Sequence, residues 1–264
     1  MKKSFFLAFS CLFLSFAPLA MASSHDSKTL HLVADEWCPY NCEPNSQFPG
    51  YMVEIAQKTF EPMGYKIEYS IMPWEQAVKG VRDGSIDGAI APAQSDAPDL
   101  IFSDEPLGVN SNVFFTKKDS TWEYKGISSL ESVSLAVSEG YTYGKELDEY
   151  IKKNSENKSR IQTSSSDDAL YENVKKIQFG HVDVMLENPN VAEYKFRLIN
   201  FGDGYRIAGE VKEPAYYSNL YIGFSPKRKD AKELAAALSD SVKKMRDNGE
   251  LKEILDKYNV PDWK

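Results

Sequence analysis

Short apolar runs alternate along the chain with stretches in which apolar residues recur every three or four positions. The first pattern is typical of buried strands, and the second of helices with one face packed on a core. The predicted strands lie at 30–34, 65–71, 86–91, 112–116, 134–137, 160–163, 182–186 and 216–224. The predicted helices lie at 52–60, 74–82, 143–153 and 166–179, after Pro189, and along apolar stripes at 234–245 and 251–258. This alternation predicts an α/β protein.

Two distant parts of this pattern share one plan. The segment GSID at 84–87 and the segment GHVD at 180–183 each follow a predicted helix and lead into a short apolar strand. A glycine suits the end of a helix, where the backbone often turns into the left-handed region. The shared plan predicts two α/β lobes with a cleft between them.

The first 22 residues carry the pattern of an export signal. Two lysines precede an apolar run at 5–19, and Ala-Met-Ala at 20–22 is a small-x-small cleavage site. The run is short for a membrane span, and no later segment of the sequence approaches about 20 continuous apolar residues. We therefore predict cleavage after Ala22. An uncleaved anchor and a lipoprotein site at Cys11 are the alternatives.

The charge of the chain narrows the classes of partner. The net charge is −8 with neutral histidines, and removal of residues 1–22 would make it −10. Such a surface repels nucleic acid and anionic lipid, so neither is an expected partner. It favours neutral or cationic solutes over anionic ones.

Cys38 and Cys42 are the two cysteines that remain after cleavage. In an oxidising compartment such a pair is expected to form a disulfide, which would hold the short turn between them rigid. The alternative is a metal site that includes His25 and His31, but their spacing matches no usual zinc motif. We therefore predict the disulfide and expect neither a metal ion nor another cofactor.

Four parts of the chain fit one pattern when they are taken in order. They are ADEWCPY at 34–40, PGYMVEI at 49–55, GSIDGA at 84–89 with FSDEP at 102–106, and NGELKEILDKY at 248–258. Together they resemble the family 3 extracellular solute-binding proteins, the periplasmic amino-acid-binding proteins that feed ABC transporters. The resemblance covers nearly the whole chain after the export signal.

The resemblance implies a two-lobed periplasmic-binding-protein fold of type II. The first lobe would combine 28–116 with 217–264, and the second would be the inserted segment 117–216. Two crossings of extended chain, near 116–119 and 213–218, would form the hinge. A solute that contacts both lobes would then favour their closure.

The expected cleft lies beyond the carboxyl ends of the strands. Asp35, Glu36 and Trp37 directly follow the first strand, and Trp74 lies in an equivalent position after the strand at 65–71. By the resemblance, Trp37 and Trp74 match the two aromatic residues that sandwich a ligand. An indole face buries ligand carbon and attracts a cation by about 0.5–2 kcal/mol. The alternative interpretation places both tryptophans in the core.

One departure from the family pattern bears on the ligand. Amino-acid binders of this family usually carry an arginine shortly before the Phe-Ser-x-Pro segment, where it clamps the α-carboxylate of the ligand. Here that stretch, QSDAPDL at 94–100, holds no arginine or lysine, and Asp96 lies near the place of the arginine. We therefore expect a cationic or amine-bearing solute and not a standard α-amino acid.

The second lobe supplies the remaining candidates. The segment EGYTY at 139–143 resembles the turn in which the family holds an anionic group with backbone amides and a threonine. The aspartate that binds the amino group in the family falls near Glu187 or Asn188, and the sequence leaves open which of the two takes its place. The expected ligand-binding residues are Asp35, Glu36, Trp37, Trp74, Gln94, Tyr141, Thr142, Glu187 and Asn188.

The predicted function is the binding of a small polar solute, without catalysis, by a monomer in the bacterial periplasm. The resemblance implies delivery to an inner-membrane ABC permease, and ligand sensing for a membrane receptor is the alternative. A lyase or dehydratase on the same fold is a further alternative, with Glu187 or Asp35 as a general acid. The sequence shows no nucleophile–base pair, metal-ligand cluster or phosphate loop, so we expect no catalytic residue.

Overall fold

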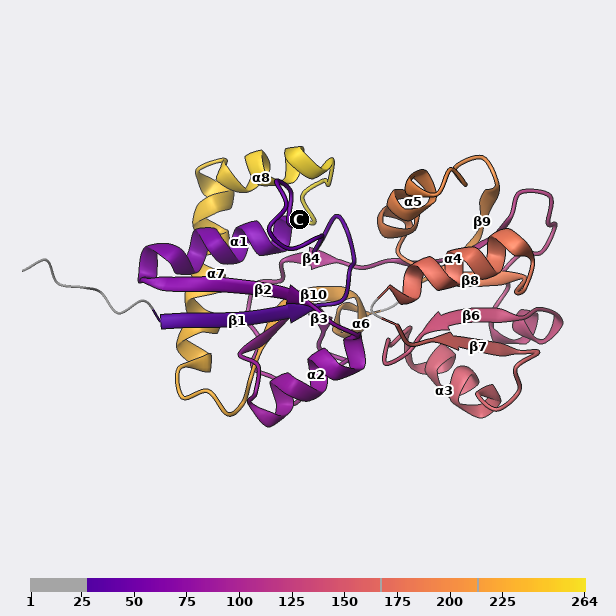
Figure 1. Ribbon diagram of the computed structural model, residues 1–264, viewed down its shortest axis with the longest axis horizontal. Coiled ribbons are helices and arrows are strands. Elements are labelled where there is room, and N and C mark those ends of the chain that lie inside the picture. Colours follow the sequence, from indigo (N-terminus) through magenta and orange to yellow (C-terminus); the bar gives the residue numbers. More distant parts are fainter. Residues whose placement is uncertain (1–27, 167, 213) are drawn as a thin grey trace, which may run out of the picture.

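The computed structural model describes residues 28–166, 168–212 and 214–264. The predicted export signal at 1–22 lies outside these residues. Two five-stranded sheets, each accompanied by helices, form two halves that follow one another along the long axis of the molecule (Figure 1). The α/β fold class predicted from the alternation of strands and helices is confirmed.

The first half is built on the strands β1 (Lys28–Ala34), β2 (Tyr65–Ile71), β3 (Gly88–Ala93), β4 (Gly108–Val109) and β10 (Asn219–Phe224). Their order across the sheet is β2-β1-β3-β10-β4. β1 runs parallel to β2 and β3, whereas β10 is antiparallel to β3 and β4. The accompanying helices are α1 (Tyr51–Phe60), the 3-10 turn η1 (Glu61–Met63), α2 (Trp74–Asp83), α7 (Ala231–Asp247) and α8 (Glu250–Tyr258) (Figure 1).

The second half is built on the strands β5 (Asn112–Lys117), β6 (Leu135–Ser138), β7 (Ile161–Ser164), β8 (Val184–Glu187) and β9 (Tyr205–Val211). Their order is β7-β6-β8-β5-β9, with β6 parallel to β7 and β8 and with β5 antiparallel to its neighbours. The accompanying helices are the 3-10 helix η2 (Ile127–Ser132), α3 (Lys145–Asn154), α4 (Ala169–Phe179) and α5 (Pro189–Leu198).

The chain passes between the sheets at two places. The first crossing is at Asn110 and Ser111, because β5 pairs with β8 and β9 of the second sheet. It therefore lies before the crossing predicted near 116–119. The apolar pattern of β5 suits a central place in either sheet and does not by itself identify the partner strands. The second crossing leads from β9 through the short helix α6 (Ala215–Ser218) into β10. The predicted lobe boundaries themselves stay a prediction.

The strand β9, like the two-residue strand β4, has no counterpart among the predicted strands. It is the edge strand of the second sheet, and most of its side chains are at least partly exposed, Ile207 by 46%. An edge strand with one buried position, Ala208, lacks the continuous apolar run by which central strands are found. The predicted strand at 216–224 is also shorter in the structure, because α6 occupies its first residues.

The two Gly-x-x-Asp segments perform the same task in the two halves. Gly84 ends α2 with a φ of 86°, and Gly180 ends α4 with a φ of 74°, both in the left-handed region. Asp87 accepts a hydrogen bond of 2.8 Å from the backbone of β1, and Asp183 accepts one of 2.8 Å from the residue before β6. Each aspartate thus ties the turn after a helix to a neighbouring strand.

The apolar stripes predicted near the end of the chain face the core. The seven stripe residues of α7 and α8 are each at most 3% exposed, namely Leu234, Leu238, Val242, Met245, Leu251, Ile254 and Leu255. The half-buried Tyr258 donates a hydrogen bond of 2.6 Å to Glu54 of α1 and so joins α8 to α1. Within the part of the chain that the structure describes, no helix has the length and apolar character needed to cross a membrane.

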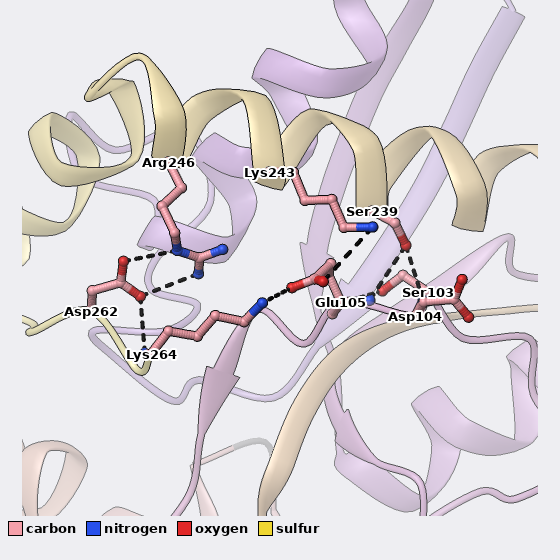
Figure 2. A network of polar contacts seen from close by, with 8 residues as sticks. All are labelled: Ser103, Asp104, Glu105, Ser239, Lys243, Arg246, Asp262 and Lys264. Carbon is pink, nitrogen blue, oxygen red and sulfur yellow. Dashed lines mark hydrogen bonds and ion pairs between the residues drawn. The ribbon is translucent and has the colours of Figure 1, made fainter.

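The last residues of the chain fold back against α7. Asp262 forms a salt bridge of 2.9 Å with Arg246, and Lys264 reaches the carboxylate of Glu105 (Figure 2). The guanidinium of Arg246 lies 5.2 Å from the centre of the Trp263 ring. That ring stacks on a tyrosine of α1 at a centroid distance of 6.2 Å. A single indole therefore joins the tail to both α1 and α7.

Replacement of Trp263 by alanine is expected to lower the free energy of unfolding by about 2 kcal/mol. Truncation of a fully buried tryptophan costs about 3–5 kcal/mol, and Trp263 is only partly buried. Lys264→Ala is the matched control, because it removes a half-exposed ion pair of the same tail and should cost less than about 1 kcal/mol. Urea denaturation measures both. Equal losses in the two variants would contradict an anchoring role for the indole.

Candidate functional site

A small cavity lies where the two halves meet. It is lined by Asp35, Trp37, Trp74, Ile90, Ala91, Ala93, Asp96, Asn110, Tyr141, Thr142, Tyr217 and Leu220. The volume of the cavity is about 40 Å³, which is room for a few water molecules. A larger solute therefore enters only when the two halves move apart, and the wall must adjust around it when they close again. The cavity borders the carboxyl ends of β1 and β3, as expected for ligand sites in sheets of this kind.

The turn after β1 presents Trp37 to the cavity. Cys38 and Cys42 in this turn form a disulfide, which confirms the predicted pair. The backbone N–H of Trp37 donates to the carbonyl of Asn41 at 2.9 Å, and the indole stacks on Tyr40 at a centroid distance of 4.4 Å. The covalent loop, the backbone hydrogen bond and the ring contact together hold the indole in one orientation.

Trp74 brings a second indole to the same cavity. It is the first residue of α2, where the preceding Pro73 sets the entry to the helix. Its ring meets Tyr141 of the second half edge to face, with centroids 6.3 Å apart and ring planes at 81°. The structure therefore brings Trp37 and Trp74 together, although the nature of any solute between them stays a prediction.

Two carboxyl groups on the cavity wall bond to the second half of the molecule. Tyr141 donates its hydroxyl hydrogen to Asp35 Oδ2, and Thr142 donates to Asp96 Oδ1. Asp96 also accepts a hydrogen bond of 2.7 Å from the backbone N–H of Ala93. Burial disfavours the charged form and raises the pKa of Asp35 and of Asp96 from 3.8 to about 6. Both carboxyls thus contact neutral donors.

The cavity wall carries acidic groups without matching basic ones. No lysine, arginine or histidine is found among the described residues that line it. Nor do the described residues contain a group of three or more His, Cys, Asp or Glu side chains placed to hold a metal ion. The polar chemistry of this wall is therefore that of carboxyl, amide and hydroxyl groups.

Glu187 and Asn188 lie next to Trp37 and are not part of the cavity wall. Glu187 accepts hydrogen bonds on Oε1 from Trp37 Nε1 at 2.9 Å and from the N–H of Asn188 at 2.7 Å, and burial raises its pKa from 4.5 to about 7. Asn188 Oδ1 caps α5, and its Nδ2 donates to Tyr40 at 3.1 Å and to Asn110 at 2.9 Å. Of the two candidates for the amino-group position, Glu187 contacts a wall residue through its carboxyl, while Asn188 is engaged in capping.

Glu36 pairs with a lysine of the second half. Lys195 is 4% exposed, and its Nζ lies 3.4 Å from Glu36 Oε1 and 3.0 Å from Asp168 Oδ1. Asp168 belongs to the same half as the lysine, where it caps α4. The contact with Glu36 is therefore an ion pair between the two halves, formed beside the cavity and not on its wall.

The structure does not bring Gln94 to the cavity. Gln94 lines a separate surface groove between the segment that follows it and α7, and Asp96, two residues further along the turn, lies on the cavity wall. Gln94 begins the stretch at 94–100, in which Asp96, and not Gln94, lies near the place of the family's arginine. Asn110 and Tyr217 also line the cavity, at the two crossings, and were not among the expected residues.

The chain has relatives over nearly its whole length. The family model of bacterial extracellular solute-binding proteins, family 3, matches residues 31–261. The arginine-binding extracellular protein ArtP of Bacillus subtilis (strain 168) is 25% identical over 260 residues, which is 93% of this chain and 93% of that protein.

Solved structures share the two-lobed architecture. One comes from work on glutathione import via GshT and the cystine ABC importer TcyBC of Streptococcus mutans, with a TM-score of 0.72, 21% identity, and coverage of 89% of this chain and 98% of that chain. Another is a histidine kinase sensor domain with similarity to periplasmic binding proteins, with a TM-score of 0.70, 18% identity, and coverage of 89% and 96%. The predicted two-lobed fold of periplasmic binding proteins is confirmed.

Proposed function

We propose that this chain, which belongs to the bacterial extracellular solute-binding proteins of family 3, binds a small cationic or amine-bearing solute between its lobes. The membership confirms the resemblance seen in the sequence, and it supports a binding role. The choice of a cationic solute depends on one observation, that Asp35 and Asp96 share a cavity wall with two indoles. Residence in the periplasm and delivery of the solute to an ABC importer belong to the same proposal.

An ordinary α-amino acid fits this wall poorly. Its carboxylate would lie near Asp35 and Asp96 and would find no lysine, arginine or histidine among the wall residues that the structure describes. An unpaired buried charge is costly by several kcal/mol. A cationic group would instead form favourable contacts with the two carboxylates and with the indole rings of Trp37 and Trp74. The relative ArtP is an arginine-binding protein, and arginine shares a cationic group with the proposed solute but also carries an α-carboxylate.

Lobe closure is the proposed mechanism. Hydrogen bonds already join the halves around the cavity, among them those from Tyr141 to Asp35 and from Thr142 to Asp96, and one of 3.0 Å between Thr142 and Ser95. A solute that contacts both halves stabilises their closed arrangement, because only a difference in contacts can shift the equilibrium. The two crossings between the sheets would act as the hinge.

Mass spectrometry of the solute released from natively purified protein tests the proposal. We expect an unaltered cationic or amine-bearing compound, and a chemically converted product would instead indicate catalysis. A thermal-shift panel then compares cationic, neutral and acidic solutes. At a free solute concentration of 1,000 times the Kd, binding stabilises the folded protein by about 4 kcal/mol, so a true ligand raises the melting temperature clearly. A rise with acidic solutes alone would refute the proposal.

Replacement of Lys195 by methionine is expected to weaken binding of the recovered solute by about tenfold, because the closed form loses the ion pair with Glu36. Asp168→Asn is the control: it removes a partner from the same half and leaves the contact between the halves in place. Calorimetry measures affinity, and stopped-flow fluorescence should show faster release from Lys195→Met. A larger loss of affinity in Asp168→Asn would argue against a role of Lys195 in closure.

A sensing role is the second candidate, because the fold is shared with a histidine kinase sensor domain. Both roles use the same closed form and differ in the membrane protein that recognises it. Crosslinking of the solute-loaded protein in its native membrane distinguishes them. Capture of a permease supports transport, and capture of a receptor supports sensing.

A further inference from the structure

The charge of the cavity wall is set by two side chains. Asp35 directly follows β1, and Asp96 lies in the turn after β3. The other polar side chains of the wall are neutral amide, hydroxyl and indole groups. When both carboxyls are ionised, the wall therefore carries two negative charges, and its described residues supply no positive charge to balance them.

The groups around these carboxyls do not supply the missing charge either. Asp35 faces the hydroxyl of Tyr141 and feels the repulsion of Asp96 and Asp168, which adds to the effect of burial in raising its pKa. Asp96 faces Thr142 and feels the repulsion of Asp148. The strongest charge effects on the two wall carboxyls therefore come from negative groups.

The buried lysine beside the cavity is already engaged. Lys195 Nζ lies 3.4 Å from Glu36 Oε1 and 3.0 Å from Asp168 Oδ1. Its single positive charge is therefore already paired with two carboxylates that are not on the cavity wall. Glu187 meets the indole N–H of Trp37 and the N–H of Asn188, both neutral donors. The positive charge that balances the wall has to come from protons or from the solute.

We infer that the solute is a dication without a carboxylate, such as a short diamine or an amine joined to a guanidinium group. This inference rests on the proposed function and narrows the class of its ligand. Asp35 and Asp96 bind the two cationic groups, and the rings of Trp37 and Trp74 pack on the carbon chain between them. A basic amino acid brings two positive charges and one negative charge, and its carboxylate gains no lysine, arginine or histidine partner from the described wall.

Proton uptake makes the number of solute charges measurable. The raised pKa values of Asp35 and Asp96 are about 6. At pH 5.5, a wall carboxyl that becomes buried by lobe closure without a cationic partner therefore takes up a proton. A dication replaces both protons, whereas a monoamine replaces one. Binding of a monoamine should therefore take up about one proton more than binding of a diamine. Glu187 adds the same uptake in both cases, because it contacts no cationic group of the solute.

The test is calorimetry on the full chain after the export signal, at pH 5.5, in two buffers that differ in ionisation enthalpy. The probes form matched pairs: 1,4-diaminobutane against ornithine, and (4-aminobutyl)guanidine against arginine, with 1-aminobutane as the monoamine. We expect each dication to bind about 100-fold more tightly than its amino acid, with one proton fewer taken up than for 1-aminobutane. Asp96→Asn should weaken 1,4-diaminobutane about tenfold or more and 1-aminobutane far less.

The control variant is Asp256→Asn, an exposed carboxylate paired with Lys252 on α8, which should leave all affinities unchanged. Tighter binding of ornithine or arginine than of the matching dication would overturn this inference and leave the proposed function in place. Equal weakening of diamine and monoamine by Asp96→Asn would overturn it as well. Failure of every cationic probe to bind would overturn the proposed function and this inference together.

Discussion

Acidification from pH 8 to pH 5 is expected to close the two lobes of the ligand-free protein. In the closed arrangement, burial raises the pKa of Asp35 and Asp96 to about 6 and that of Glu187 to about 7. When the lobes part, water returns these values toward about 4. The closed form therefore holds its protons more tightly. Closure is favoured below the ordinary pKa, and this advantage is lost as the pH rises through 6 to 7.

The expected effect is large because three carboxyls act in the same direction. Over this pH range, each aspartate contributes roughly a factor of ten to the closing equilibrium and Glu187 contributes roughly a factor of 100, so the total is on the order of 10⁴. The ion pair of Lys195 with Glu36 also joins the two lobes and requires a charged carboxylate. The measurement therefore stops at pH 5, above the range in which ordinary carboxylates take up protons.

Small-angle X-ray scattering measures the effect as a fall in the radius of gyration on acidification. The triple variant Asp35→Asn, Asp96→Asn, Glu187→Gln should be compact at every pH, because its neutral groups no longer disfavour closure. Asp256→Asn, which changes an exposed carboxylate, should behave like the unmodified protein. A radius that is independent of pH, or one that grows on acidification, would show that these carboxyls do not control closure.

The parts of the fold that could be predicted from the sequence are those defined by local chemistry. The strands β3, β6 and β8 are short buried runs, and Gly84 and Gly180 mark helix ends in the two halves, so the repeated α/β plan was readable. The edge strand β9 could not be predicted, because its partly exposed residues resemble those of a loop. The place of the first crossing depends on which strands pair with β5, and pairing is a long-range property.

The candidate site divides in the same way. Residues that follow a strand, such as Asp35 and Trp37, could be placed at the cleft because the end of a strand determines their position. The contact of Asp96 with Thr142, 46 residues away, and that of Lys195 with Glu36, 159 residues away, arise only when the halves meet. Gln94 shows the limit of local reasoning, because one turn separates it from the wall that Asp96 occupies.

Replacement of Trp74 by alanine is expected to reduce affinity for the solute recovered from the native protein by about 100-fold or more. The indole is 7% exposed, lines the cavity and meets Tyr141 of the other lobe, so under the proposed function it contacts the solute and also supports the closed form. Truncation of a buried aromatic anchor commonly costs more than about 2 kcal/mol of binding, and a cation on an indole face adds about 0.5–2 kcal/mol. Isothermal titration calorimetry measures the loss.

Two further variants separate the indole face from apolar volume, because alanine at this position also opens a hole beside Ala77 and Val81. Trp74→Phe keeps an aromatic face and Trp74→Leu keeps only bulk, so a cationic solute should bind the phenylalanine variant more tightly. Trp122→Leu removes a comparable indole from the core of the second half and should lower stability without changing affinity. If Trp74→Leu and Trp122→Leu reduced stability alike and left affinity intact, Trp74 would be a core residue, and the cavity would lose its aromatic wall.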